Sequence, residues 1–110
     1  MELAKIPMPK LLILIDWFTP GFKAGGPIRS VENIVHLLKS RFQIYILTSN
    51  KDFGEAKAYP DIRPNQWLRF DENVEVCYLS AENQNIKHLR KYMKAISPDV
   101  VYLNLSLIHI

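Results

Sequence analysis

Apolar residues along this chain form short segments, and each segment has the spacing of either a strand or a helix. A continuous apolar run at residues 11–15 is typical of a strand buried on both faces of a parallel sheet, and the apolar runs at residues 44–47 and 100–103 predict two further strands. Between residues 74 and 78 apolar residues alternate with Glu75 and a cysteine, which predicts a strand nearer the edge of the sheet. We therefore expect four strands.

Two stretches between these strands have the three- and four-residue spacing of an amphipathic helix. The apolar positions of the first stretch are Ile28, Val31, Val35 and Leu38. Those of the second stretch are Ile86, Leu89, Met93 and Ile96. Pro27 suits the first turn of a helix, where its missing N–H needs no partner, and Ser97-Pro98-Asp99 is expected to end the second helix.

The order of the elements is strand, helix, strand, loop, strand, helix, strand. This order predicts an α/β fold with a Rossmann-like parallel sheet covered by helices. Residues 48–66 are rich in Asn, Asp, Gly, Pro and Lys, which is typical of a surface loop. Ligands of such sheets bind at the carboxyl ends of the strands, so we expect a site in the loop after the first strand.

The composition narrows the class of protein. The chain has 110 residues, of which 48% are hydrophobic and 23% charged, as in one globular domain. Cys77 has no second cysteine to pair with, which excludes a disulfide framework and a cysteine-rich zinc site. The net charge of +3 is too small to indicate nucleic-acid binding. The first apolar run ends at Asp16, too early for a signal peptide, so we expect a cytoplasmic protein.

Candidate chemistry gathers in residues 16–30, which join the first strand to the first helix. Gly25 and Gly26 can take positive φ and leave the helix N-terminus open to an anion. Lys23 and Arg29 can add charge-assisted hydrogen bonds to a phosphate. The alternative is structural, because Gly-Gly-Pro is also a common start of a helix and basic residues near a loop are usually solvated.

Two known phosphate-binding motifs are absent from this segment. A dinucleotide site needs Gly-x-Gly-x-x-Gly directly after the strand, and a P-loop needs Gly-Lys-Ser/Thr. The loop is also longer than the tight turn of a dinucleotide site, which disfavours an NAD-dependent oxidoreductase. No Asp-x-Asp triplet occurs, so metal dependence is not indicated and we expect no cofactor.

Several motifs along the chain carry a resemblance to a known family. They are Asp-Trp-Phe-Thr-Pro-Gly-Phe-Lys-Ala-Gly-Gly-Pro-Ile-Arg-Ser at residues 16–30, Asp52-Phe53-Gly54, Tyr59-Pro60, Trp67, and Pro98-Asp99-Val100-Val101-Tyr102-Leu103-Asn104. With these motifs, residues 10–104 resemble the family 4 retaining glycosyltransferases of the GT-B fold. The resemblance implies transfer, with retention, of a sugar from a nucleotide diphosphate sugar to a saccharide or lipid-linked acceptor, in bacterial polysaccharide or glycolipid synthesis. The site would lie between two Rossmann-like domains, of which the N-terminal one mainly receives the acceptor.

The resemblance also implies roles for individual residues. Gly25 and Gly26 match the glycine pair that faces the interdomain cleft near the donor phosphates, and Arg29 lies one helical turn beyond. No catalytic residue is assigned within the chain.

Lys23, Asp52 and Trp67 are weaker candidates for the acceptor side. Each has a plainer role that we favour. Lys23 is expected to be a solvated charge, Asp52 a turn former before Gly54, and Trp67 a loop anchor packed on the sheet.

The second predicted helix carries a basic surface. Its cationic residues are Lys87, Arg90, Lys91 and Lys94. Such a face is usually only solvated. In enzymes that resemble this chain, however, the acceptor can be lipid-linked, and a basic amphipathic helix can hold a domain against anionic headgroups. A peripheral position at the inner face of the membrane is therefore a second expectation.

The end of the chain departs from the family resemblance. Leu105-Ser106-Leu107-Ile108-His109-Ile110 is what CTGTCTCTTATACACATC encodes, the end sequence of a transposon adapter used in preparing sequencing libraries. We interpret residues 105–110 as translated adapter and residues 1–104 as part of an N-terminal domain. The alternative is that the tail extends the last strand.

The two interpretations of the tail lead to different functions. If it is adapter, the donor domain with the family's Glu-x7-Glu pattern lies outside this chain, and the chain alone is expected to be inactive. If it is native, the better interpretation is a stand-alone, non-catalytic α/β module that binds a phosphate-bearing ligand or a protein partner.

Overall fold

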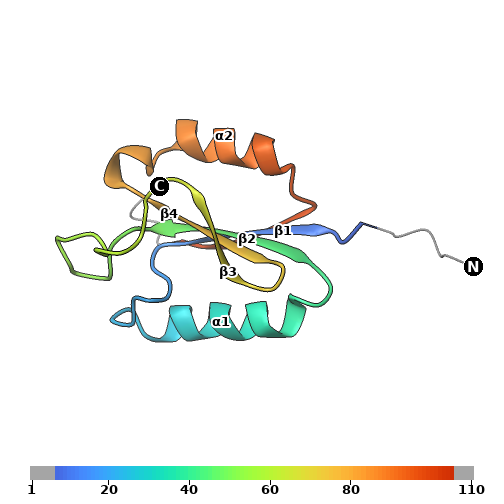
Figure 1. Cartoon of the computed structure of the whole chain (residues 1–110), viewed down its shortest axis with the longest axis horizontal. Helices are drawn as coiled ribbons and strands as arrows, with labels where there is room; N and C mark the ends of the chain where they lie inside the picture. Colours follow the sequence, from blue (N-terminus) through green and yellow to red (C-terminus); the bar gives the residue numbers. More distant parts are fainter. Residues whose placement is uncertain (1–6, 106–110) are drawn as a thin grey trace, which may run out of the picture.

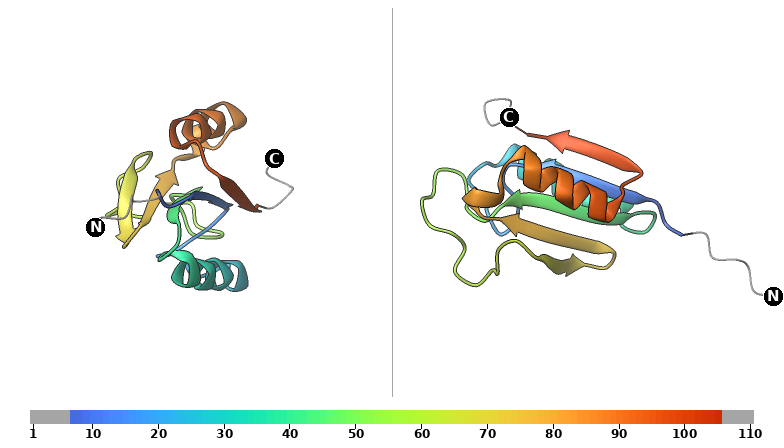
Figure 2. Two further views of the ribbon diagram at one scale, coloured as in Figure 1. Left: turned by 90° about the vertical axis from the view of Figure 1, so that its right-hand side faces the viewer. Right: turned by 90° about the horizontal axis from the view of Figure 1, so that it is seen from above.

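The computed structural model describes residues 7–105, which form a five-stranded sheet between two α-helices (Figure 1, Figure 2). α1 (Gly26–Leu38) covers one face of the sheet and α2 (Ile86–Ile96) covers the other. The strands are β1 (Lys10–Ile15), β2 (Gln43–Ser49), β3 (Trp67–Asp71), β4 (Val74–Leu79) and β5 (Val100–Asn104). A short 3₁₀ helix, η1 (Ala81–Asn83), precedes α2. The predicted α/β class is confirmed.

The sheet is mostly parallel and has the order β3-β4-β2-β1-β5. Parallel pairing joins β4, β2, β1 and β5, and the register places Ile13 of β1 beside Ile46 of β2 and Tyr102 of β5. The chain thus leaves β1 toward β2 on one side and returns to β5 on the other. This reversal makes the carboxyl ends of β1 and β5 a topological switch point, where open α/β sheets bind ligands.

The expectation of four strands in a purely parallel sheet is wrong at one edge. β3 pairs antiparallel with β4 through a turn at Glu72-Asn73, where Asn73 has a φ of 61°. The sequence pattern missed β3 because its side chains are half-buried or exposed and form neither an apolar run nor a clean alternation. β4, which was expected nearer the edge, is therefore flanked by strands on both sides, and its Cys77 is fully buried.

The face of the sheet under α1 holds the larger hydrophobic core. Successive strand residues point to opposite faces, so every second residue of β1, β2 and β4 enters this core. Its buried residues are Leu11, Ile13, Ile15, Phe18, Ile28, Val31, Val35, Ile44, Ile46, Val74, Val76 and Tyr78. The three buried positions of α1 are among those that the helical spacing predicted.

The face under α2 is packed less completely. Its buried residues are Leu12, Leu14, Leu47, Cys77, Leu79 and Ile96. Ile96 is the only buried residue of α2, whereas Leu89 and Met93 are half-buried. The Nζ of Lys10 donates a hydrogen bond to the Ile96 carbonyl at 3.0 Å, which fixes the last turn of α2 to the start of β1. α2 is therefore held most firmly at its C-terminal end.

β5 forms the second edge of the sheet. Its side chains are largely exposed, with Val100 at 48% and Leu103 at 64% exposure. The strand ends at Asn104, and Leu105, the first residue of the predicted adapter tail, packs half-buried against the core under α2. Residues 106–110, the remainder of that tail, lie outside the described residues.

Candidate functional site

The loop between β1 and α1 is held in place by Asp52, which lies in the long loop after β2. Asp52 is only 7% exposed, and its carboxylate accepts hydrogen bonds from the N–H groups of Phe22 at 3.2 Å and Lys23 at 3.3 Å. The same carboxylate accepts a hydrogen bond from the N–H of Phe53 at 2.8 Å. Backbone donors thus satisfy this buried acid, and the two loops are fixed against each other.

Two tyrosines fix the start of the same loop. Tyr78 of β4 donates its hydroxyl hydrogen to the Thr19 carbonyl at 2.6 Å, and Tyr59 donates to the Phe18 carbonyl at 3.4 Å. Burial raises the pKa of both tyrosines to about 12, and the charge of Asp52 adds to the effect at Tyr59. Both hydroxyls therefore remain protonated donors at neutral pH.

Gly21 is the glycine of this loop that packing requires. A Cβ at this position would lie 2.7 Å from Asp52 Oδ1 and 3.0 Å from the Phe18 carbonyl oxygen, and it would also clash with Tyr59 Oη. Sequence reasoning did not single out Gly21. The atoms that crowd it belong partly to residues far along the chain, so no local motif marks it.

Gly25 and Gly26 lie in open surroundings instead. Gly25 caps α1 with a φ of 69°, whereas Gly26 is already the first helical residue, so the expected positive φ occurs at Gly25 alone. Apart from its chain neighbours and, at Gly26, the backbone of α1 itself, a Cβ at either position would meet no atom within 4 Å in the described part of the chain. Contacts with distant parts of the described chain therefore give no reason for a glycine at position 26.

The two basic candidates of the loop differ in their surroundings. Arg29 is exposed on the first turn of α1, and its N–H donates to the Gly25 carbonyl at 3.2 Å. Lys23 forms an ion pair with Glu55, in which both side chains are 44% exposed. The structure thus brings Arg29 to the same helix end as Gly25 and Gly26, and it directs Lys23 toward the neighbouring loop.

Trp67, a weaker acceptor candidate, lies away from this helix end. It is the first residue of β3, not a loop residue, and packs edge-on against Tyr45 and Tyr92 with ring centroids 5.3 Å and 6.0 Å apart. These contacts belong to the core under α2. The plainer expectation that Trp67 packs on the sheet is confirmed.

Two cavities open at the carboxyl ends of the strands. One, called here the crevice, has a volume of about 240 Å³ and is lined by Ile15, Asp16, Trp17, Pro27, Asn104 and Leu105. The crevice lies between the ends of β1 and β5 and the start of α1, at the topological switch point. Sequence reasoning placed the site in this region without identifying Asn104 or Trp17 as part of its wall.

The second, the α2-face cavity, has a volume of about 230 Å³ and lies between the sheet, η1 and α2. Its apolar wall includes Leu14, Leu47, Leu79, Ala81 and Leu89. Asp16 and Ile15 border both cavities, which therefore meet at the end of β1. Leu105, the first residue of the tail interpreted as adapter, also borders both.

Two buried polar atoms near this edge have no hydrogen-bond partner among the described residues. They are Oγ1 of Thr48, a residue that also lines the α2-face cavity, and Oδ1 of Asn50. Thr48 is 3% exposed and Asn50 is 7% exposed. A buried acceptor or hydroxyl without a partner is costly, so a hydrogen-bonding partner at either atom would stabilise the end of β2.

Neither a metal site nor a membrane span is found within residues 7–105. No group of three or more His, Cys, Asp or Glu side chains gathers there, and no helix of that range is both long and apolar enough to cross a membrane. No family model, curated protein or solved structure matches the chain. Its function has to be inferred from the geometry at the carboxyl ends of the strands and from the sequence motifs.

Proposed function

We propose that this chain is the acceptor-side domain of a retaining glycosyltransferase that uses a nucleotide diphosphate sugar, as its motifs imply. The observation that most supports the proposal is the uncovered Gly25-Gly26 pair at the start of α1, beside the crevice. A ligand that closely approaches the helix N-terminus gives a physical reason for glycine at position 26.

The diphosphate of the donor would lie against the first turn of α1. Pro27 has no N–H, so this turn offers the amides of Gly26 and Ile28, together with the positive end of the helix dipole. Arg29 adds an exposed cation on the same turn. Such donors would stabilise the negative charge that develops on the departing nucleotide diphosphate, and a second domain would supply the rest of the donor site.

The anchored half of the loop would keep this helix end ready for the ligand. Asp52, Tyr59 and Tyr78 hold the backbone from Phe18 to Lys23, directly before the glycine pair. A loop fixed before the ligand arrives loses little conformational entropy on binding. These three side chains therefore act as supports of the proposed site and need not touch the substrate.

Titration of the ¹⁵N-labelled chain with pyrophosphate tests the anion site. We expect the amide signals of Gly26, Ile28 and Arg29 to shift, because they lie in the first turn of α1. Gly26→Val should weaken binding about tenfold by covering this turn. The new Cβ meets no atom within 4 Å apart from its chain neighbours and the backbone of its own helix, and far-UV circular dichroism checks that α1 still starts before Pro27 in the variant.

Asn33→Val is the matched control for that substitution. Asn33 is exposed on the same helix, farther from its N-terminus, so the variant adds the same side chain without covering the first turn. Its pyrophosphate affinity should equal that of the unmodified chain. Equal affinity in Gly26→Val, or shifts confined to other parts of the chain, would show that α1 does not bind the diphosphate.

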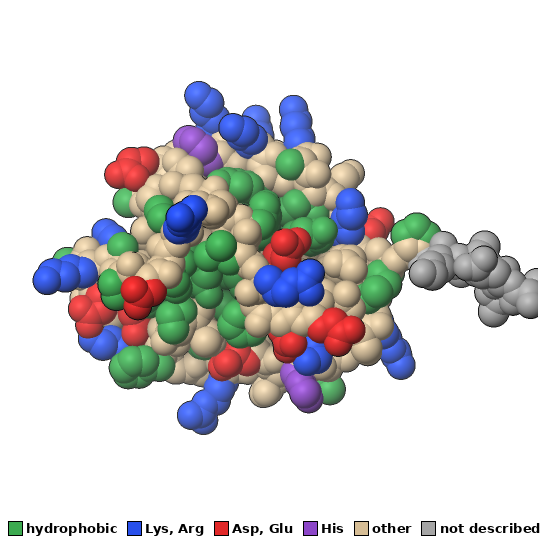
Figure 3. Space-filling view, in the orientation of Figure 1, with side chains coloured by type: hydrophobic (Ala, Val, Ile, Leu, Met, Phe, Trp, Pro, Cys, Tyr) green, Lys and Arg blue, Asp and Glu red, His purple; other side chains and the backbone are tan. Residues whose placement is uncertain are grey.

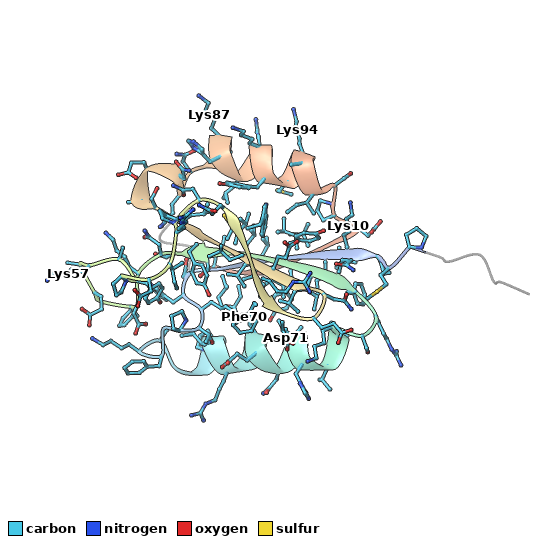
Figure 4. All side chains as sticks on the ribbon, viewed as in Figure 1. Lys10, Lys57, Phe70, Asp71, Lys87 and Lys94 are labelled. Atoms are coloured by element: carbon cyan, nitrogen blue, oxygen red, sulfur yellow. The ribbon has the colours of Figure 1, made fainter. Side chains whose placement is uncertain are left out.

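We also propose that α2 holds the domain at an anionic membrane surface on the cytoplasmic side, where a lipid-linked acceptor would lie. Lys87, Arg90, Lys91 and Lys94 are all exposed, and the helix carries no acidic residue. Lys87 and Lys94 point away from the sheet (Figure 4), and basic side chains project from this side of the surface (Figure 3). Ile86 is 59% exposed at the start of the helix and adds apolar surface.

Co-sedimentation with vesicles that contain phosphatidylserine tests this contact. Reversing the four charges to Glu should abolish binding, and added salt should weaken binding of the unmodified chain. Reversing Arg41, Lys57 and Arg63, which are exposed outside α2, is the control and should reduce binding less. Equal binding after reversal on α2 would remove the membrane proposal and leave a solvated helix face.

A further inference from the structure

The α2-face cavity is separate from the anion site at α1, because the two lie on opposite faces of the sheet. Its floor is made by Leu14, Leu47 and Leu79, at the carboxyl ends of β1, β2 and β4. η1 and the first half of α2 form its roof through Ala81 and Leu89. Because α2 is buried only at Ile96, its N-terminal half leaves this space open beside the strand ends.

The size of the cavity limits what it can hold. An apolar cavity of about 150 Å³ is known to accommodate a benzene molecule. At about 230 Å³, the α2-face cavity has room for a six-membered ring or a short alkyl chain. It is smaller than the about 300–1,000 Å³ of typical pockets for larger ligands, so only part of a nucleotide would be enclosed.

The charge of the cavity limits the ligand further. Asp16 is the only ionisable residue in its described lining, and no lysine or arginine borders it. Ser49 and Gln84 complete the polar rim, where Gln84 Nε2 donates to Ser49 Oγ at 3.3 Å and to the Leu79 carbonyl at 2.9 Å. An apolar floor below a carboxylate favours a neutral ligand with a hydroxyl group and disfavours a phosphate.

The position of Asp16 connects this cavity with the proposed chemistry. Asp16 directly follows β1 and borders both the α2-face cavity and the crevice. A ligand whose apolar part fills the cavity would therefore present its hydroxyl at the wall of the crevice. The carboxylate can accept several hydrogen bonds, so other contacts of Asp16 do not prevent this one.

We propose that the α2-face cavity binds an acceptor that joins a small apolar group to a sugar, and that Asp16 accepts a hydrogen bond from a hydroxyl of that sugar. The apolar group lies on Leu14, Leu47, Leu79 and Leu89. Asp16 is a positioning residue that keeps the hydroxyl beside the crevice. The assignment of this ligand as the acceptor rests on the proposed glycosyltransferase function.

Phenyl β-D-glucoside is the probe for this site, because it carries one aromatic ring and several hydroxyls. Titration into the ¹⁵N-labelled chain should shift the amide signals of Leu79, Ala81, Gln84 and Leu89. Glucose has the hydroxyls without the ring and should bind at least about tenfold more weakly. Shifts confined to residues outside the cavity, or equal binding of glucose, would overturn the proposal.

Two substitutions reduce the volume of the cavity in independent ways. Leu89→Phe enlarges the half-buried side chain in its roof, and Ala81→Leu enlarges an exposed one on η1 that is less important for folding. Both should weaken glucoside binding about tenfold. Met93→Phe, on the same side of α2 but outside the cavity lining, is the matched control and should bind as the unmodified chain does.

Asp16→Asn separates recognition of the hydroxyl from recognition of the ring. The affinity for phenyl β-D-glucoside should fall several-fold, whereas that for toluene, which has no hydroxyl, should not change. Loss of affinity for both would mean that Asp16 only maintains the shape of the cavity. If the chain binds the glucoside but not pyrophosphate, the cavity site stands and the glycosyltransferase proposal is contradicted. If it binds pyrophosphate but not the glucoside, only the cavity site is contradicted.

Discussion

The two faces of the sheet differ in how completely their helices cover them. α1 buries Ile28, Val31 and Val35 against the strands, and Phe18 from the anchored loop closes the same core. α2 buries Ile96 alone and leaves a cavity beside its first half. The closely packed face fixes the position of the α1 N-terminus, whereas the open face has space for a ligand. In the proposed site, close packing under α1 therefore fixes the anion-binding helix end, and the free volume under α2 holds the acceptor.

The largest expected difference between the faces is in the loss of unfolding free energy when a buried residue of β1 is replaced by alanine. Ile13 is fully buried under α1, and Leu14 is 5% exposed under α2, where it borders the cavity. Ile13→Ala should lower the free energy of unfolding by about 4 kcal/mol, and Leu14→Ala by about 2 kcal/mol, because part of the space around Leu14 is already empty. Urea unfolding measures both changes. Equal losses would mean that the two faces are packed alike.

Alkaline pH should weaken the α2 face first. Burial raises the pKa of Cys77 under α2 from 9.0 to about 11, and it raises those of Tyr59 and Tyr78 under α1 from 10.0 to about 12. The folded chain holds these protons more tightly than the unfolded chain, so stability falls as the pH rises through each interval.

Unfolding measured from pH 8 to pH 12 separates these contributions. Cys77→Ala should remove the part of the fall that begins near pH 9, and Tyr78→Phe should remove part of the fall above pH 10. A stability that stays constant from pH 9 to pH 11 would contradict the burial of all three groups.

A smaller difference in stability is expected when the hydroxyl of one tyrosine on each face is removed. Tyr78 donates to the Thr19 carbonyl at 2.6 Å under α1, and Tyr92 donates to the Asn65 carbonyl at 3.3 Å on the α2 side. Tyr78→Phe should cost about 1.5 kcal/mol, because it removes a short bond to a buried loop, and Tyr92→Phe should cost about 0.5 kcal/mol. Thermal unfolding at neutral pH compares the two variants. A larger loss for Tyr92→Phe would reverse the predicted order.

The smallest expected effect is a change in melting temperature when a surface lysine at either helix is replaced. The Nζ of Lys39, at the end of α1, lies 2.8 Å from Asp71 Oδ2 in β3, whereas Lys87 of α2 points into solvent (Figure 4). Lys39→Met should lower the melting temperature slightly, and Lys87→Met should leave it unchanged. The hydrogen bond from Lys39 lowers the pKa of Asp71, so the difference should disappear in acid as this carboxyl becomes protonated. A difference that persists after protonation would exclude the ion pair as its cause.

Local sequence patterns predicted the elements whose burial follows a simple period. Both helices and the strands β1, β2 and β4 were expected near their observed positions, because their apolar residues recur with the spacing of the structure. β5 was expected from its apolar run, although its side chains are largely exposed in the structure. β3 has no such pattern, since it is half-exposed and forms only by pairing with β4. The formation of such a strand depends more on pairing with its neighbour than on the β-propensity of its own residues.

Only those features of the candidate site that lie within one loop could be predicted from the sequence. The open glycines Gly25 and Gly26 are visible in the sequence, but the constraint on Gly21 comes from Asp52 and Tyr59 in another loop. The ion pair of Lys23 and the α2-face cavity likewise depend on segments that are far apart along the chain. Contacts between distant segments have no local signature, so these features required the structure.

Sequencing the source locus from unfragmented genomic DNA, across the codons for Tyr102 to Ile110, tests the central proposal most directly. A glycosyltransferase predicts that the reading frame continues beyond Asn104 into a second domain of about 150–200 residues that carries Glu-x7-Glu. A stop codon directly after Ile110 would contradict this proposal. The chain would then be better explained as a small module that binds a phosphate-bearing ligand without catalysis.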